Sequence, residues 1–318
     1  MSESPVNPSY HPQAVMDDEI DLKELFMVLW SGKWLISAVT GVAAVTSVVI
    51  ALSLPNIYTA NALLAPADQS GGGMSAMMQQ YGGLASLAGV SLPGGDEASR
   101  AQLGMALMTS RSFIGDFVER RDILPELMAV ESWDMTSGEL TFDDALYDAT
   151  TSEWVREVDP PRTPAPSLLE AHKAFSDILA VSQDKQTGYI TVSVEHKSPS
   201  VAAQWIDWLV KDANEAVRAQ DVDEANRSIS YLREQVSNTS LADLQAVFFD
   251  LIQSQTETVM LAEVREEYVF KTIDPAVAPE IKSKPSRALI CVLGTLLGGM
   301  LGVVVVLIRH YARSEAAD

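Results

Sequence analysis

Residues 284–310 read KPSRALICVLGTLLGGMLGVVVVLIRH, and this stretch decides the fold because it is able to cross a lipid bilayer. The run from Ala288 to Ile308 holds 21 apolar or small residues and carries no charge. A hydrocarbon core about 30 Å thick needs ~20 residues of helix that rise about 1.5 Å each. The run therefore predicts a membrane-spanning helix.

Three glycines in this run, Gly294, Gly298 and Gly302, recur every fourth residue and therefore share one face of the predicted helix. Small residues on one face let two membrane helices approach closely, which favours their association in lipid. Glycine is also frequent in membrane helices that have no such role. A packed face would meet the first span with its Gly41, another subunit or a second membrane protein. We expect bulky substitutions at Gly298 or Gly302 to alter assembly.

A second uncharged run of 21 residues extends from Trp34 to Leu54. It follows a leader of 33 residues with an acidic stretch, whereas a cleaved signal peptide has a shorter apolar core behind a short basic start. We therefore interpret it as a retained anchor. Lys23 and Lys33 precede the run and the next basic residue is Arg100, so the positive-inside rule predicts cytoplasmic tails. The residues between the spans are then expected on the periplasmic side of the inner membrane.

The 233 residues between the two runs, 55–287, are enough for one large domain or two small ones. They carry 35 Asp and Glu against 18 Lys and Arg, a formal charge of −17. This field repels nucleic acid, so no nucleic-acid partner is expected, and the acidity is typical of a well-solvated surface. The single cysteine, Cys291, lies in the run from Ala288 to Ile308, so we expect no disulfide in the domain.

Periodicity inside this segment predicts an α+β fold, in which an α/β base carries a long helical hairpin arm. The region 130–166 is expected to be irregular, and 218–227 is polar almost all round, which predicts that it projects into water or meets another subunit. The expected elements are a strand (56–66), a helix (97–121), a helix (167–183), a strand (188–197), a helix (198–237), a helix (240–267) and a strand (268–276).

The expected organisation, in chain order, is a cytoplasmic tail (1–33), a first transmembrane helix (34–54), a periplasmic domain (55–287), a second transmembrane helix (288–308) and a cytoplasmic tail (309–318). Within the domain, the arm covers about 199–267 and a proline-rich segment covers 274–287. Pro275, Pro279 and Pro285 block a helix and hold this segment extended, either as a linker or as a functional hinge.

Nothing in the sequence predicts catalysis, a cofactor or a metal site. Asp143 and Asp144 are adjacent, and neighbouring carboxylates rarely direct their side chains at one glycosidic bond. The glycine-rich segment 70–95 lacks the Gly-Lys-Ser/Thr of a phosphate loop and holds no basic residue, so it predicts a mobile apolar loop. Trp205 and Trp208 lie at helical spacing among aliphatic residues, which favours a core position over a sugar-stacking one.

Five segments of the chain resemble one family. DEIDLKELFMVLWSGKWLI (18–36) and, after the first span, YTANALLAP (58–66) are similar to the amino-terminal region of Wzz-type polysaccharide co-polymerases. DPAVAPEIKSKPSR (274–287) before LGTLLGGMLG (293–302) resembles their proline-rich segment entering a glycine-bearing second span. SPSVAAQWIDWLVKDANE (198–215) resembles the start of their long helix. These proteins determine the chain length of lipopolysaccharide O-antigen and related glycans.

The resemblance implies a ring-shaped homo-oligomer in the inner membrane that acts on a lipid-linked glycan beside a Wzy-type polymerase. It implies contact with membrane lipids, no catalysis by this chain and no cofactor. Some relatives in capsule and exopolysaccharide synthesis carry a kinase after the second span. Ten residues follow Ile308, with one tyrosine, Tyr311, so we expect the version without a kinase domain and no signalling receptor. A structural adaptor for capsule or exopolysaccharide export is the alternative function.

Overall fold

The computed structural model of this chain describes residues 22–67, 96–239 and 241–314. The glycine-rich segment 70–95, for which a mobile loop is expected, lies outside them. The described residues form two compact units. One contains the residues up to Leu54 together with those from Ser286 onward, and the other contains Pro55–Pro285.

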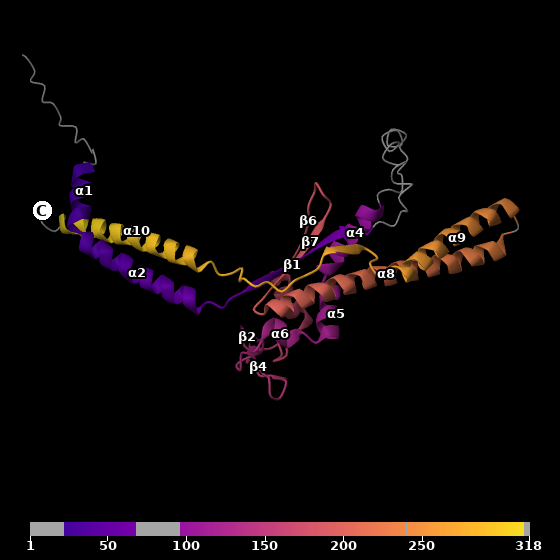
Figure 1. Ribbon diagram of the computed structural model, residues 1–318, viewed down its shortest axis with the longest axis horizontal. Coiled ribbons are helices and arrows are strands. Elements are labelled where there is room, and N and C mark those ends of the chain that lie inside the picture. The colour runs from indigo at the N-terminus through magenta and orange to yellow at the C-terminus, as the bar shows by residue number, and fades with distance from the viewer. Residues whose placement is uncertain (1–21, 68–95, 240, 315–318) are drawn as a thin grey trace, which may run out of the picture. The chain divides into compact units, whose positions relative to one another are not determined.

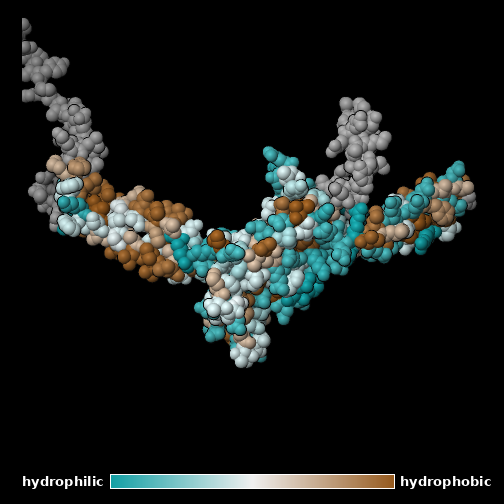
Figure 2. Space-filling view, in the orientation of Figure 1, coloured by the Kyte–Doolittle hydropathy of each residue, from teal (hydrophilic) through white to brown (hydrophobic). Residues whose placement is uncertain are grey.

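Three helices make up the first unit: α1 (Leu22–Ser31), α2 (Lys33–Ser53) and α10 (Arg287–Ser314). Two of these helices, α2 and the part Arg287–His310 of α10, are long and apolar enough to cross a membrane. Most of their side chains are exposed, and Figure 2 shows the brown, hydrophobic surface over both helices. They pack side by side along their length (Figure 1). This surface needs a lipid environment because it would otherwise present apolar side chains to water.

A four-stranded antiparallel sheet in the order β6-β7-β1-β8 forms the base of the second unit. Every second residue of β1, namely Tyr58, Ala60, Ala62 and Leu64, is buried, as the predicted alternation requires. The same alternation is present in β7, which pairs with β1. The strands are β1 (Tyr58–Pro66), β6 (Leu179–Gln183), β7 (Ile190–His196) and β8 (Phe270–Asp274).

One long helix, α8 (Pro199–Asn238), lies against this sheet with its first half and extends beyond it with its second half (Figure 1). It begins as predicted, because the Ser198 hydroxyl accepts a hydrogen bond from Val201 N–H and proline occupies the first helical position. Two further helices contribute to the core, α5 (Arg111–Arg121) and α7 (Leu168–Ile178). The predicted start of α7 is confirmed by a capping box between Ser167 and Glu170.

The second half of α8 and the following helix, α9 (Ala242–Val264), form the predicted hairpin arm. The 40 residues of α8 correspond to a rod of about 60 Å. The polar stretch 218–227 is not surrounded by water on all sides, contrary to the expectation. Ala225 within it is only 1% exposed, and Asp221 accepts a hydrogen bond from the Tyr268 hydroxyl at 2.8 Å.

Two predicted elements differ in the structure. The helix expected over 97–121 is two helices, α4 (Asp96–Met108) and α5. The break lies at Ser110, whose backbone is extended and whose hydroxyl caps α5 by accepting a hydrogen bond from Phe113 N–H. The helix expected over 167–183 ends at Ile178, and the chain continues directly into β6.

The region 130–166 also differs from the expectation, because it is not wholly irregular. It contains two small hairpins whose aromatic side chains contact one another: Phe142 lies against Tyr147, and Tyr147 lies against Trp154. Short strands of this kind lack the length that makes alternation visible in a sequence. They follow α6 (Leu124–Met128) and are β2 (Val130–Trp133), β3 (Leu140–Phe142), β4 (Tyr147–Asp148) and β5 (Glu153–Trp154).

Candidate functional site

The glycine face of α10 lies against α2 of the same chain. A Cβ added at Gly294 would lie 2.4 Å from the Cβ of Ser47, and one added at Gly298 would lie 2.3 Å from the Cβ of Ala43. At Gly302 the nearest atom is a backbone carbon of α2 at 3.1 Å. No side chain fits at the first two positions without moving a helix, so the close approach depends on glycine.

Two neighbouring glycines lie outside this tight contact. Nothing lies within 4 Å of a Cβ placed at Gly41, so the first span contributes other small residues to the contact and not this glycine. A Cβ at Gly299 would lie 3.7 Å from the Thr40 hydroxyl, which is an ordinary van der Waals distance. Gly298 and Gly299 therefore form a matched pair in which only the first requires the absence of a side chain.

An arginine joins the two helices where α2 ends and α10 begins. Arg287, in the first turn of α10, donates from Nε to the Ala51 carbonyl at 3.0 Å, in the last turn of α2. The last carbonyls of a helix have no intrahelical donor and carry partial negative charge. The guanidinium therefore satisfies an orphan acceptor and stabilises the end of α2 electrostatically.

Within the second unit, the segment that follows α2 is hydrogen-bonded to the segment that precedes α10. Ile57 and Lys284 form an antiparallel bridge, with N···O distances of 3.0 and 3.2 Å. Ser283 N–H donates to the Ile57 carbonyl at 2.8 Å, and the Thr59 hydroxyl donates to the Ser283 hydroxyl at 2.7 Å. These bonds hold together the two points at which the chain enters and leaves the domain.

Two prolines of the segment 274–287, Pro275 and Pro279, lie between β8 and this bridge. Residues 275–283 carry neither helix nor strand, which agrees with a segment in which Pro275, Pro279 and Pro285 exclude a helix. The last of them directly follows the bridged residue Lys284. The segment is therefore attached at both ends, to β8 at one end and to Ile57 at the other.

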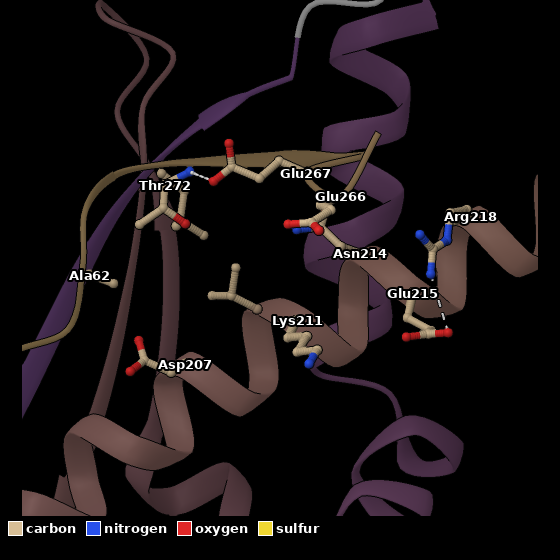
Figure 3. A pocket seen from close by; sticks show the side chains of 11 residues that line it. Ala62, Asp207, Lys211, Asn214, Glu215, Arg218, Glu266, Glu267 and Thr272 are labelled. Atoms are coloured by element: carbon tan, nitrogen blue, oxygen red, sulfur yellow. Dashed lines mark hydrogen bonds and ion pairs between the residues drawn. The ribbon is translucent and has the colours of Figure 1, made fainter. Parts of the chain in front are cut away.

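A groove of about 490 Å³ lies between α8 and the chain that returns into β8 (Figure 3). Both signs of charge line it, and two contacts inside it are drawn in Figure 3: Glu215 with Arg218 at 3.2 Å, and Thr272 N–H with the Glu267 carboxylate at 2.9 Å. Burial raises the pKa of Asp207, which also lines the groove. Four carboxylates and two basic side chains line the groove, so acidic groups predominate, and the lining offers no nucleophile with an adjacent base.

Asn214 of α8 fastens the returning chain to the base. Its side-chain oxygen accepts hydrogen bonds from Val269 N–H at 2.7 Å and from Phe270 N–H at 2.9 Å. Its amide nitrogen donates to the Phe270 carbonyl at 3.1 Å. All these atoms are buried, so one side chain satisfies three backbone groups at the base of the arm.

A buried carboxylate joins α5 to α8. Asp212 is 5% exposed and receives two hydrogen bonds from Arg121, at 2.6 and 3.4 Å, with Arg120 at 3.6 Å as a second cation. The Arg121 guanidinium also lies over the ring of Trp208, 4.9 Å from its centre. The guanidinium thus neutralises the only buried acid of this helix that the structure describes.

Sequence reasoning missed both Asp212 and Asn214. The signal was present, because both occupy positions on the apolar stripe of α8, where a polar side chain requires a buried partner. Neither partner was identifiable, because Arg121 is 91 residues away from Asp212 and Val269 is 55 residues away from Asn214.

Asp143 and Trp205, which the sequence analysis considered for glycoside hydrolysis and sugar stacking, both stabilise the fold. Asp143 accepts a hydrogen bond from Ala145 N–H at 2.9 Å, so its carboxylate stabilises a turn. Trp205 is fully buried between the rings of Phe175 and His196, which confirms the predicted core position. In the part of the chain that the structure describes, no three His, Cys, Asp or Glu side chains come together as a metal site.

These features define a class of protein. The chain is a two-helix membrane protein in which an α+β domain with a hairpin arm lies between the two helices in sequence. Its described residues form a scaffold with close helix contacts and buried polar anchors. The contacts described above all lie within one chain and stabilise its fold.

Comparison with known families narrows this class. The sequence model of the Wzz family, described as chain length determinant protein, matches residues 18–120. The GNVR model, described as the G-rich domain on putative tyrosine kinase, matches residues 243–311. The chain is therefore similar to Wzz proteins over residues 18–120, which confirms the resemblance found at its amino-terminal end, while its far end is similar to the GNVR domain. None of its 318 residues forms the Gly-Lys-Ser/Thr of a phosphate loop.

Two solved structures are similar to the chain. One is described as a full-length bacterial polysaccharide co-polymerase, with 14% identity, a TM-score of 0.42 and coverage of 94% of this chain and 100% of that one. The other is a fragment of WzzB, a polysaccharide co-polymerase from Salmonella Typhimurium, with 13% identity, a TM-score of 0.29 and coverage of 72% and 100%. No curated protein sequence matches this chain significantly.

Proposed function

We propose that this protein regulates the chain length of a surface polysaccharide, O-antigen or a related glycan, without catalysing a reaction itself. The match of residues 18–120 to the chain length determinant family carries this proposal. In the proposal the protein is a homo-oligomer in the inner membrane and acts on a lipid-linked glycan beside a Wzy-type polymerase.

The proposed topology places both tails in the cytoplasm and residues 55–287 in the periplasm. The lysines before the first span support it, because the basic bias around the first span usually sets orientation. A fluorescent protein that folds only in the cytoplasm, fused after Asp318, is expected to be bright. A dark fusion at normal abundance, together with an active periplasmic phosphatase at the same position, would contradict the topology.

The arm supports the proposed assembly. Leu244, Val247 and Leu251 lie on one side of α9 and are 42%, 52% and 45% exposed. An apolar stripe on a helix in an aqueous compartment favours association, because burying it against a partner removes apolar surface from water. The tight α2–α10 contact is internal to the chain, so the glycine face supports the fold of each subunit.

Deletion of the gene in its native host tests the function directly. Gel electrophoresis of the surface glycan is expected to show a modal length in the wild type and a broad distribution of lengths in the deletion strain. Plasmid-borne wild-type protein is expected to restore the mode. An unchanged length distribution in the deletion strain would reject the proposal.

A structural adaptor in capsule or exopolysaccharide export is the second candidate. The GNVR match supports this candidate, because its description refers to a putative tyrosine kinase. Relatives in capsule and exopolysaccharide synthesis carry such a kinase or partner with one. The same deletion separates the two functions. A regulator changes the length of glycan on the cell surface, whereas an adaptor abolishes its appearance there.

A further inference from the structure

A second groove, of about 850 Å³, lies where α1, α2 and α10 meet within the first unit. Its volume is in the range of small-molecule sites, and its lining combines apolar and polar side chains. Val28, Leu35 and Val306 contribute apolar surface, while Arg309 and His310 contribute the basic groups. The groove also includes Ser31, Gly32, Trp34 and Ala38.

The sequence places this groove at the depth of lipid headgroups. Trp34 begins the uncharged run of α2, and Arg309 directly follows the uncharged run of α10. Tryptophan and basic side chains are preferred at the boundary between hydrocarbon and water. The groove therefore opens at one membrane surface, where phospholipid phosphates lie.

Among the described side chains of this unit, one arginine has no counter-ion. Residues 26–54 and 286–310, whose side chains are described, contain no Asp or Glu and three Lys or Arg. The amine of Lys33 lies over the Trp30 ring at 4.7 Å, and Arg287 is hydrogen-bonded to α2 at the other end of the pair. Arg309 forms no hydrogen bond or ion pair with a described residue, and it lines the groove. A guanidinium in this position has the geometry to hold a phosphate with two hydrogen bonds.

The shape of the groove depends on Gly32, between α1 and α2. A Cβ at this residue would lie 2.5 Å from a methyl carbon of Val306, so α10 approaches the junction only because glycine is present. Gly32 N–H still donates to the Val28 carbonyl at 3.1 Å, and its carbonyl accepts from Ile36 N–H at 3.0 Å. The junction is thus hydrogen-bonded, and Val306 closes part of the groove.

We propose that this groove binds the phosphate of a membrane phospholipid, with Arg309 as the principal phosphate ligand. The apolar side chains of the lining contact the glycerol and the first methylenes of the lipid, which a soluble anion lacks. The site anchors one end of the helix pair to a lipid that remains bound when the protein is extracted.

Native mass spectrometry of the full-length protein, extracted in detergent and titrated with phosphatidylglycerol, tests the proposal. The wild type is expected to retain this lipid with saturable affinity, and Arg309→Gln to weaken the affinity about tenfold, the effect of losing one charged hydrogen-bonding partner. Lys33→Gln is the matched control, because it removes the same charge at the same end of the helices while its amine lies on Trp30. Its affinity is expected to stay within about twofold of wild type.

A second variant and a second probe complete the test. Gly32→Ala leaves Arg309 in place but displaces Val306, and it is expected to weaken lipid retention while circular dichroism shows a folded protein. Inorganic phosphate at millimolar concentration is expected not to displace the lipid. Equal losses in Arg309→Gln and Lys33→Gln, an unchanged Arg309→Gln, or displacement by inorganic phosphate alone would each overturn the proposal.

Discussion

Asn214 stands on the buried face of α8 and forms, with one side chain, the hydrogen bonds that a neighbouring strand would otherwise supply to Val269 and Phe270. A buried amide of this kind stabilises little in itself, because the unfolded chain bonds equally well to water. Its removal is costly, because the backbone groups stay buried without partners. Single residues of this type therefore determine where the arm joins the base.

Asn214→Leu is expected to destabilise the protein by about 3 kcal/mol, the sum expected for buried backbone groups that lose their partners. Thermal unfolding of the detergent-extracted protein measures the effect. Asn226→Leu is the control, because Asn226 is exposed on the same helix and its replacement is expected to change stability by less than about 0.5 kcal/mol. Equal melting temperatures for Asn214→Leu and wild type would show that the contact contributes nothing.

His196 is the second informative residue. Burial lowers its pKa below 6.5, and its ring lies between the Ser198 N–H, 3.0 Å from Nδ1, and the Glu126 carbonyl, 3.0 Å from Nε2. The neutral ring with its proton on Nε2 satisfies both contacts, since Nδ1 then accepts and Nε2 donates.

The depressed pKa of His196 predicts a loss of stability in mild acid. The unfolded state takes up a proton near pH 6.5 that the folded state resists, so stability is fully present above that pH and falls as the pH is lowered through the folded pKa. Melting temperatures between pH 7.5 and 5.5 measure this slope, and His196→Gln is expected to flatten it. Burial raises the pKa of Glu126, which acts in the opposite direction, so the difference between the two proteins is the relevant quantity. If wild type and His196→Gln showed the same dependence of melting temperature on pH, a depressed pKa of His196 would be refuted.

At the scale of elements, α2 and α10 pack so closely that no side chain fits at Gly294 or Gly298 of α10. The two helices therefore behave as one unit. Membrane helices gain little from the hydrophobic effect when they associate, since lipid is as apolar as their side chains. Close packing is therefore the main source of their association. An added Cβ would lie 2.3 Å from the nearest atom of α2 at Gly298, but 3.7 Å from it at Gly299. The requirement for glycine is therefore specific to one face of α10.

Gly298→Ala is expected to separate the helices and to cost about 1–3 kcal/mol, as overpacking does in a well-packed interior. Gly299→Ala is expected to be nearly neutral. Thermal stability in detergent distinguishes the two variants, and the glycan ladder of the native host shows whether the change reaches function. Ala43→Gly combined with Gly298→Ala is expected to restore stability. A Gly298→Ala protein as stable as Gly299→Ala would contradict the packing argument.

At the scale of the whole molecule, the arm presents apolar side chains that none of the described residues covers. Phe248 and Val259 of α9 are partly covered, whereas Leu244 and Leu251 are exposed. The α8–α9 contact uses a neighbouring side of α9. The exposed stripe of Leu244, Val247 and Leu251 is consequently available to another protein.

Leu244→Ser combined with Leu251→Ser is expected to shift the protein to smaller assemblies, because each buried leucine contributes roughly 1.5–3 kcal/mol at an interface. Light scattering coupled to size-exclusion chromatography in detergent measures the mass. Gln253→Ser, an exposed polar substitution on the same helix, is expected to leave the mass unchanged. A double variant that is folded and keeps the wild-type mass would exclude this stripe from the assembly interface.

The amino-acid sequence by itself determined the membrane helices, the alternating strands β1 and β7, and the start and approximate length of α8. Each of these depends on a local pattern: an uncharged run, a period of two, or a serine followed by proline. The short hairpins in 130–166 and the break at Ser110 escaped prediction, because their patterns are too short or are outweighed by the helical residues on both sides. The family resemblance came from the order of several modest motifs.

Only the tertiary structure decided which side chains meet. The glycine face had three possible partners in the sequence, and the structure pairs it with Ser47 and Ala43, more than 240 residues earlier in the chain. Asn214 and Asp212 were recognisable as polar residues on an apolar stripe, but their partners come from distant segments. The physical reason is that patterns of hydrophobicity record which face of an element is buried, whereas the identity of its neighbour depends on packing between elements that share no local pattern.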